Sequence, residues 1–262
     1  MKQFESQILS LKPVAQGYYR LDFLWSPESE PMAGQFLTIR VGELSVPLLR
    51  RPFALSAYDK DKGIASIIFQ KIGKGTELLS HMNPGDSIDI LGPLGNCFSQ
   101  VVSPADNMKE KHIVVAGGIG TGPMLYLADE LKREGKNPLL IIGCRTKDLV
   151  PYSEIDKSIE TVICTDDGSD GFRGNVVEYM RSNPLLEHNS VIYCCGPEPM
   201  LNGCHSYAVE MGISSYVSLE QMMACGIGAC MGCTCEINNE KKKYARVCKE
   251  GPVFSGGEIK WT

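Results

Sequence analysis

The chain has 262 residues, of which 43% are hydrophobic and 22% are charged, a composition that is ordinary for a folded globular protein. Its net charge of −5 argues against nucleic-acid binding, because phosphate neutralisation requires a basic face. The opening MKQFESQILSLK lacks the apolar core of a secretory signal, and no apolar run approaches the roughly 20 residues of a membrane span. We therefore expect a cytoplasmic protein that does not enter a membrane, whose 11 cysteines serve metal or redox chemistry rather than disulfides.

The N-terminal part of the chain has the pattern of a small barrel. Short apolar or alternating runs at 17–25, 35–41, 64–72 and 86–92 are separated by turn signals such as DKDKG and NPGD. Many short strands at this spacing predict an antiparallel β barrel, which we assign to residues 1–103.

The pattern changes after NMKEK, where continuous apolar runs begin to alternate with helical periodicity. The runs that predict buried parallel strands are 112–116, 138–144, 160–165 and 190–196, and the helical patterns are 123–137 and 198–212. Such alternation predicts a parallel sheet with crossover helices, here over residues 104–215. The rest of the chain, 216–262, is mostly loop, glycine and cysteine.

The loop EQMMACGIGACMGCTCE holds four cysteines, and a fifth follows in YARVCKEGP. Cys225, Cys230 and Cys233 are spaced C-x4-C-x2-C and Cys248 follows later, which is the plant-type spacing for the ligands of a 2Fe-2S cluster. The glycines between them allow close backbone approach, so that N–H groups can point at the sulfurs. A structural zinc site is the alternative, but such sites usually pair two C-x2-C knuckles and this chain has one. Cys235 is left over as a spare.

Two further motifs lie where parallel sheets bind ligands. VVAGGIGTGPM follows a strand and opens a helix, so its backbone N–H groups predict a phosphate site. It departs from G-x-G-x-x-G, and a tight turn without a ligand is an equal alternative. YCCGPEPM ends a parallel strand at the carboxyl edge, where Cys195 can touch a cofactor or simply pack. The candidate residues of the two motifs are Gly117, Gly118, Gly120, Thr121, Gly122, Cys195, Gly196 and Pro197.

Three weaker signals complete the reading from the residues. In RRPFALS, Arg51 can pair with a pyrophosphate and Phe53 can cover a flat ring, although a surface arginine beside a core aromatic is the simpler interpretation. IGKGT can add backbone amides to the same phosphate, or be an ordinary turn. TDDGSDGFRG lacks EF-hand spacing and is either a ribose-facing loop or a plain turn.

Taken in order, these motifs resemble the ferredoxin-NADP reductase superfamily. AGQFLTIR, RPFALS, GKGT and GDSIDILGPLGN resemble its flavin domain, and GGIGTGP and CGPEPM resemble its nicotinamide domain. With TDDGSDGFRGNV and SLEQMMACGIGACMGC added, the order is similar to the electron-transfer subunits of dihydroorotate dehydrogenase B in particular. The resemblance covers nearly the whole chain. It implies a six-stranded antiparallel barrel for FAD, an α/β domain for NADH and a C-terminal 2Fe-2S module.

The resemblance also implies site residues. Its flavin segments match Arg51, Pro52, Phe53 and Ala54, then Ile68, Phe69 and Gln70, then Gly75 and Thr76; its cluster ligands match Cys225, Cys230, Cys233 and Cys248. Ala54 replaces a usual hydroxyl, and Gln70 stands where the superfamily often has arginine.

The implied function is that of an oxidoreductase subunit without a catalytic acid or base. Electrons would pass from NADH through FAD and the cluster to the FMN of a separate dihydroorotate dehydrogenase catalytic subunit, in a heterotetramer with two copies of each chain. No orotate site is readable in the sequence. The alternative is a diaphorase-type subunit of another complex, such as a ferredoxin reductase, hydrogenase or sulfur reductase.

Overall fold

The computed structural model describes residues 1–42, 47–183 and 189–261. Six antiparallel strands close into a barrel in the order β1-β2-β5-β4-β3-β6. Their side chains alternate between core and solvent, as in β1, because successive residues of a strand point to opposite faces. The elements of this part are β1 Lys2–Ala15, β2 Tyr18–Leu24, β3 Phe36–Arg40, β4 Arg51–Asp59, β5 Ile64–Gln70, α1 Lys74–Leu79 and β6 Ser87–Leu94.

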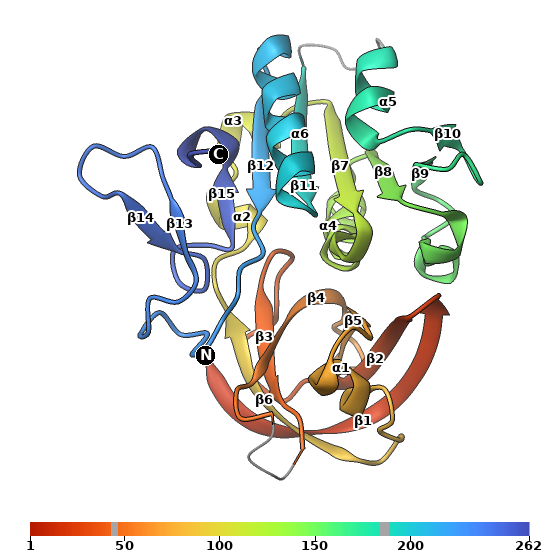
Figure 1. Ribbon diagram of the computed structural model, residues 1–262, viewed down its shortest axis with the longest axis vertical. Helices are drawn as coiled ribbons and strands as arrows, with labels where there is room; N and C mark the ends of the chain where they lie inside the picture. Colours follow the sequence, from red (N-terminus) through yellow and green to blue (C-terminus); the bar gives the residue numbers. More distant parts are fainter. Residues whose placement is uncertain (43–46, 184–188, 262) are drawn as a thin grey trace.

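The second part is a seven-stranded sheet in the order β10-β9-β8-β7-β11-β12-β15, which stands above the barrel in Figure 1. All its pairs are parallel except that of β12 with β15. Its strands are β7 Lys111–Gly117, β8 Pro138–Cys144, β9 Glu160–Thr165, β10 Phe172–Arg173, β11 Ser190–Cys195, β12 Ser214–Ser218 and β15 Val253–Ser255. Its α-helices are α2 Phe98–Val101, α3 Pro104–Asn107, α4 Thr121–Arg133, α5 Val176–Ser182 and α6 Glu198–Met211.

The C-terminal segment forms a small lobe beside the sheet, drawn in darker blue in Figure 1. A hairpin of β13 Thr234–Glu236 and β14 Tyr244–Arg246 carries the lobe, and β15 returns to the sheet edge. The boundary expected between 215 and 216 therefore falls inside β12, and the C-terminal segment completes the sheet of the middle part. Short 3-10 turns occur at η1 Gly118–Gly120, η2 Lys147–Leu149, η3 Tyr152–Glu154 and η4 Gly256–Glu258.

Two polar contacts fix helix α4 against the barrel. The Tyr126 hydroxyl donates to the carbonyl of Pro31 over 2.6 Å, and the carboxylate of Glu130 accepts from the N–H of Ala33 over 3.1 Å. Both acceptors and donors are buried or half-buried, so each contact satisfies a group that would otherwise be costly to bury. The two contacts therefore join α4 to the segment that leads into β3 of the barrel.

The predicted fold class, an antiparallel barrel joined to a parallel-sheet domain, is confirmed. Within the described ranges, no helix combines the length and apolar character needed to cross a bilayer.

Candidate functional site

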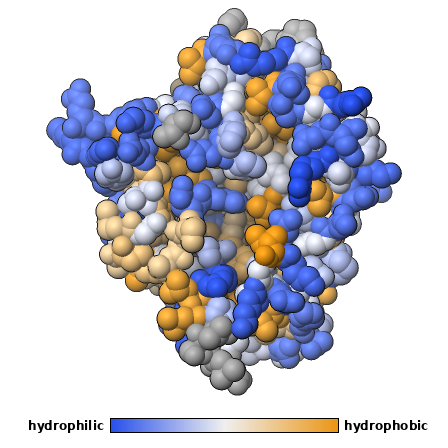
Figure 2. Space-filling model, viewed as in Figure 1, coloured by the Kyte–Doolittle hydropathy of each residue, from blue (hydrophilic) through white to orange (hydrophobic). Residues whose placement is uncertain are grey.

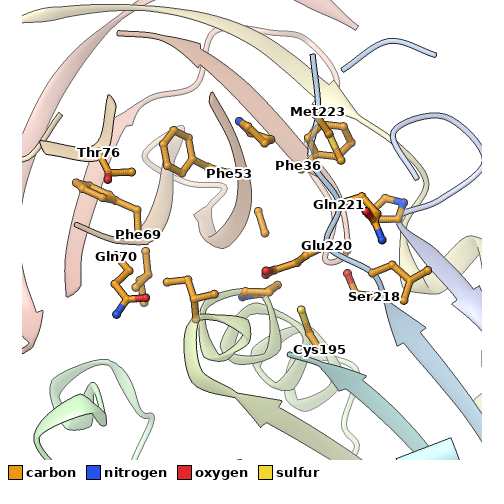
Figure 3. Close-up of a pocket in the computed structure, with 18 of the residues that line it drawn as sticks. Phe36, Phe53, Phe69, Gln70, Thr76, Cys195, Ser218, Glu220, Gln221 and Met223 are labelled. Carbon is orange, nitrogen blue, oxygen red and sulfur yellow. The ribbon is translucent and has the colours of Figure 1, made fainter. Parts of the chain in front are cut away.

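A first cavity opens between the barrel and the carboxyl edge of the sheet; we call it the barrel-side cavity (Figure 3). Phe53 and Phe69 line it from β4 and β5, and their rings meet edge to face with centroids 5.9 Å apart. A largely apolar wall with a few polar groups suits a flat aromatic ligand. Its lining includes seven residues expected from the sequence: Pro52, Phe53, Ala54, Ile68, Phe69, Gln70 and Thr76.

Arg51 and Gly75, also expected there, are outside this lining and contact each other. A Cβ on Gly75 would lie 2.9 Å from Nε of Arg51, so a larger residue there would displace the arginine side chain from its present path. The Arg51 guanidinium donates to the carbonyl of Leu49 over 2.6 Å. Close by, the Thr76 hydroxyl accepts from the N–H groups of Ile72 and Gly73 and so shapes the start of α1.

A second cavity lies at the ends of the parallel strands; we call it the sheet-edge cavity. Gly117, Gly118, Gly196 and Pro197 line it, as expected from the two motifs. The carboxyl ends of parallel strands are where open α/β sheets bind ligands, and the N-terminus of α4 adds a partial positive charge.

The remaining residues of these motifs hold the site together rather than line the sheet-edge cavity. A Cβ on Gly120 would lie 2.3 Å from the carbonyl oxygen of Cys195, so glycine is required for the two turns to touch. A Cβ on Gly122 would meet Ile68 of the barrel at 3.4 Å. Thr121 is buried, and its hydroxyl has no hydrogen-bond partner among the described residues. Cys195 itself lines the barrel-side cavity.

The two cavities share three lining residues, Gln70, Ile119 and Glu220. Ligands in the two cavities would therefore approach each other at this point. Figure 3 shows the side chain of Glu220 directed into the barrel-side cavity, on the same side as Cys195 and Ser218. Desolvation by the surrounding cavity walls raises the pKa of the Glu220 carboxyl, although its side chain is exposed to the cavity space.

The cluster loop, residues 224–233, brings its cysteines together in two pairs. The backbone N–H of Cys230 donates to the sulfur of Cys225, and the backbone N–H of Cys248 donates to the sulfur of Cys233. The first pair is accessible, whereas Cys233 and Cys248 are buried. No three His, Cys, Asp or Glu side chains gather as ligands of a single metal ion within the described ranges.

Backbone N–H groups point at all four sulfurs. Gly228 donates to Cys248 over 3.1 Å, and Cys248 in turn donates its own N–H to Cys233 over 3.4 Å. The N–H groups of Cys230 and Ile227 reach Cys225 at 3.4 and 3.5 Å, and that of Gly232 reaches Cys230 at 3.4 Å. These contacts favour thiolate charge, which is what iron–sulfur ligation requires.

The pKa values of the thiols follow from this environment. Desolvation opposes ionisation of Cys225, but the N–H groups of Ile227 and Cys230 outweigh it and lower its pKa to about 6. Burial, followed by the hydrogen bond with Cys233, raises the pKa of Cys248 to about 12. A metal would displace the protons of such paired thiols on binding.

The donor set fits a 2Fe-2S cluster, because each of the two irons takes two thiolates and the loop presents two pairs. Gly226 and Gly228 adopt φ values of +69° and +80°, which glycine accepts without strain. Arg246 donates to the carbonyl of Gly228 over 2.6 Å and is held by Glu250 at 3.0 Å, which braces the loop from the hairpin.

The cluster loop also rests on the barrel. A Cβ on Gly226 would lie 3.1 Å from the Thr38 methyl group of β3. Met223, two residues before the first cysteine, lines the barrel-side cavity with Phe36 (Figure 3). The cysteine pairs are thus adjacent to that cavity along the chain and in space.

Several lining residues were missed from the sequence. Arg145 and Asp166 follow the ends of β8 and β9, and Glu220 follows the end of β12. All three are charged residues that follow the carboxyl end of a parallel strand, where open α/β sheets bind ligands. Their positions in the sequence could therefore have identified them. Tyr18 and Asn175 come from β2 and from the N-cap of α5, and carry no comparable signal.

Comparisons with known proteins agree with this arrangement. Residues 220–260 match the iron-sulfur cluster binding domain of dihydroorotate dehydrogenase B. The chain is 40% identical over 256 residues to the dihydroorotate dehydrogenase B (NAD(+)) electron transfer subunit of Geobacillus thermodenitrificans strain NG80-2, covering 96% of each chain.

Two solved structures are also similar. One is the NADH-dependent reduced ferredoxin-NADP oxidoreductase, with a TM-score of 0.83 and 28% identity over 98% of this chain and 90% of that one. The other is a ferredoxin NADP+ reductase from Neisseria gonorrhoeae with bound FAD and NADP, with a TM-score of 0.63 and 17% identity over 81% and 92%, which shows the shared fold.

Proposed function

The chain belongs to the family of dihydroorotate dehydrogenase B electron transfer subunits, and on that premise we propose that it carries electrons between NADH and a dihydroorotate dehydrogenase catalytic subunit by way of FAD and a 2Fe-2S cluster. The observation that carries this proposal is that two meeting cavities lie beside a loop in which Cys230 contacts Cys225 and Cys248 contacts Cys233.

Electron counting explains why three redox groups are needed. A hydride carries two electrons, whereas a 2Fe-2S cluster accepts one at a time, and a flavin handles both modes. The residues of this chain bind and orient these groups, and no acid–base side chain is needed for the hydride step itself. The family relation makes the chain an oxidoreductase subunit.

We assign FAD to the barrel-side cavity. Phe53 and Phe69 offer apolar surface for a flat ring, and Gln70 and Thr76 supply the polar edge. Arg51 and the amides around Gly75 stand nearby for a pyrophosphate, an assignment that rests on the family pattern. The N–H groups in the first turn of α1 have no acceptor within their own helix, which suits an anion.

We assign the nicotinamide nucleotide to the sheet-edge cavity. Gly117, Gly118, Gly196 and Pro197 leave space at the strand ends, and Arg145 supplies a positive charge. The nicotinamide ring would then reach the point where the cavities meet, beside Cys195. The four cluster ligands in this proposal are Cys225, Cys230, Cys233 and Cys248, with Cys235 excluded because its side chain lines a different cavity.

A 2Fe-2S cluster passes on single electrons, and an acceptor for them in a separate catalytic subunit requires a docked protein. Met222, Ile227 and Met231 are 88%, 43% and 53% exposed around the cluster loop, and Figure 2 shows apolar surface gathered there beneath a hydrophilic lobe. Methionine is enriched and charge depleted at the centres of interfaces. We call the surface around these three residues the cluster face. We propose that the FMN-containing catalytic subunit binds to it, in a heterotetramer with two copies of each chain.

A second candidate acceptor is favoured by one observation. The 0.83 TM-score to an NADH-dependent ferredoxin-NADP oxidoreductase raises the alternative of a subunit that feeds a ferredoxin-linked complex. We place the chain in the cytoplasm in either case, because reducing conditions keep its thiols available for metal.

Co-expression with the catalytic subunit tests the proposal. We expect the two chains to co-elute on size exclusion and to reduce orotate at the expense of NADH. A stable single chain that reduces ferredoxin rapidly, and ignores the catalytic subunit at micromolar concentration, would favour the second candidate.

A further inference from the structure

Glu220 lines three cavities at once, and no other ionisable side chain among the described residues lines the same three. It follows the end of β12 and lines the barrel-side cavity, the sheet-edge cavity and a third cavity beside β13, which we call the hairpin cavity. The cluster loop begins only four residues later. Its side chain is open to the cavities rather than packed against neighbours.

The carboxylate has no hydrogen-bond or ion-pair partner among the described residues. The charge of Glu220 acts on Tyr18 and Cys195. Burial, and in smaller part the charge of Glu220, raises the pKa of both. The carboxylate is exposed to the cavity space, so a cationic group that enters the junction can pair with its charge without displacing a partner within the protein.

Hydride transfer locates that ligand. The two reacting rings must approach to about 3–3.5 Å, so they meet where the two cavities share walls. That junction consists of Gln70, Ile119 and Glu220, and only Glu220 can carry charge. Of the two rings, the nicotinamide changes from neutral in NADH to a single positive charge in NAD+.

We infer that the carboxylate of Glu220 binds the oxidised, cationic nicotinamide ring more tightly than the reduced, neutral ring. This inference rests on the proposed function. When the hydride leaves the ring, its two electrons and one proton pass to the flavin, and the ring is left with one positive charge. Glu220 forms and breaks no bond in that step; its carboxylate faces the charge as it develops, which favours the transition state as well as NAD+.

The test compares two ligands on the oxidised holoprotein. NAD+ carries the cationic ring, and 1,4,5,6-tetrahydro-NAD is an unreactive neutral stand-in for NADH. We expect Glu220→Gln to lower the affinity for NAD+ about tenfold, the order for one unit charge roughly 10 Å away at an effective dielectric of about 20, and to leave tetrahydro-NAD unchanged. Glu220→Asp should restore much of the preference, because the charge remains.

Glu198→Gln is the matched control, since Glu198 lines the hairpin cavity and not the junction. Its ratio of NAD+ to tetrahydro-NAD affinity should equal that of the wild type. If Glu220→Gln weakens the binding of both ligands equally, Glu220 shapes the cavity without distinguishing the charge of the ring. If the variant weakens the binding of neither ligand, Glu220 has no role in binding. Either result overturns the inference. If the wild type binds neither ligand, the assignment of the nicotinamide nucleotide to the sheet-edge cavity is wrong. The FAD content of every variant is measured as well, so that loss of the flavin is distinguished from these outcomes.

Discussion

Gly228 donates its backbone N–H to the thiol of Cys248 over 3.1 Å, although the two residues are 20 positions apart. The contact ties the cluster loop to the segment after β14. It also requires glycine, because Gly228 has φ +80° and a Cβ would lie 2.6 to 3.2 Å from the side chain of Lys249.

We therefore expect Gly228→Ala to weaken cluster retention, with a strain of about 1–2 kcal/mol at the left-handed backbone. The measurement is iron per chain and the rate of cluster loss in air. Gly257→Ala is the control, because no atom lies within 4 Å of its Cβ position and its φ is not left-handed. Equal iron content and stability in both variants would contradict the role given to the loop backbone.

Serine substitutions separate the four proposed ligands from the spare thiol. Any of the four ligand cysteines changed to serine should cost the cluster, since a hydroxyl is a poor ligand for a thiolate site. Cys235→Ser should keep the iron, because Cys235 is paired on β13 with Ala245 and faces the hairpin cavity. The readouts are iron content and visible absorption. The ligand assignment would fall if Cys235→Ser lost the cluster while Cys225→Ser retained it.

Acid should loosen the contact between barrel and sheet. Arg20 of β2 donates to Glu154 of η3 over 2.5 Å and to Asp22 over 2.7 Å. Desolvation opposes the charge on both acids, but hydrogen bonds from Ser10, Ser66 and Arg20 lower the pKa of Asp22, and the bond from Arg20 lowers that of Glu154. Carboxyls with lowered pKa values stabilise the fold above their unfolded pKa of about 4, and this stability is lost as pH falls through the folded value.

Urea denaturation at pH 7 and at about pH 3, below the unfolded pKa of about 4, should therefore show a loss of stability in acid. Glu154→Gln should cost about 1.5–3 kcal/mol at pH 7, the range for a hydrogen bond to a charged group, and should flatten that pH dependence. Glu210→Gln removes an exposed ion pair with Arg181 and should change stability by less than about 1 kcal/mol. If the free energy of unfolding depends on pH in the same way in the wild type and in Glu154→Gln, the contact between Arg20 and Glu154 does not cause the loss of stability in acid.

Charge placed on the cluster face should impair assembly. Ile227→Glu and Met231→Glu put a carboxylate into a contact that we propose to be buried, and unpaired buried charge is costly. We expect the affinity for the catalytic subunit to fall at least about tenfold, as measured by titration calorimetry, while NADH still reduces the flavin. Val209→Glu, at a residue 64% exposed on α6, is the control. If Ile227→Glu binds the catalytic subunit with the affinity of the wild type, the interface does not include the cluster face.

Local patterns predicted the strands that are buried on both faces, such as β8 and β11, and helix α6 to within one residue. These elements are specified by continuous apolar runs and by 3.6-residue periodicity, which act within a few residues. The pairing of β12 with β15 joins Tyr216 to Ser255 and depends on packing far along the chain, so no local pattern reports it.

The site shows the same division. The cysteine spacing indicates a four-thiol centre because metal geometry restricts sequence spacing. The separation into two pairs, joined by N–H contacts to sulfur, is visible only once the loop is folded. Glu220 looks in sequence like any exposed acid beside a loop. Its place at the junction of the cavities follows from β12 ending beside β11, which is a property of strand order.

In this account NADH reduces the flavin by two electrons, and the flavin passes single electrons to the cluster held by the four cysteines. The most direct measurement is an anaerobic titration of the purified protein with NADH, followed by visible and electron paramagnetic resonance spectra at each step. The account predicts bleaching of a flavin band together with the signal of a reduced 2Fe-2S cluster, with about two irons per chain. Stoichiometric zinc in place of iron, or an oxidised cluster that persists after the flavin is fully reduced by NADH, would contradict it.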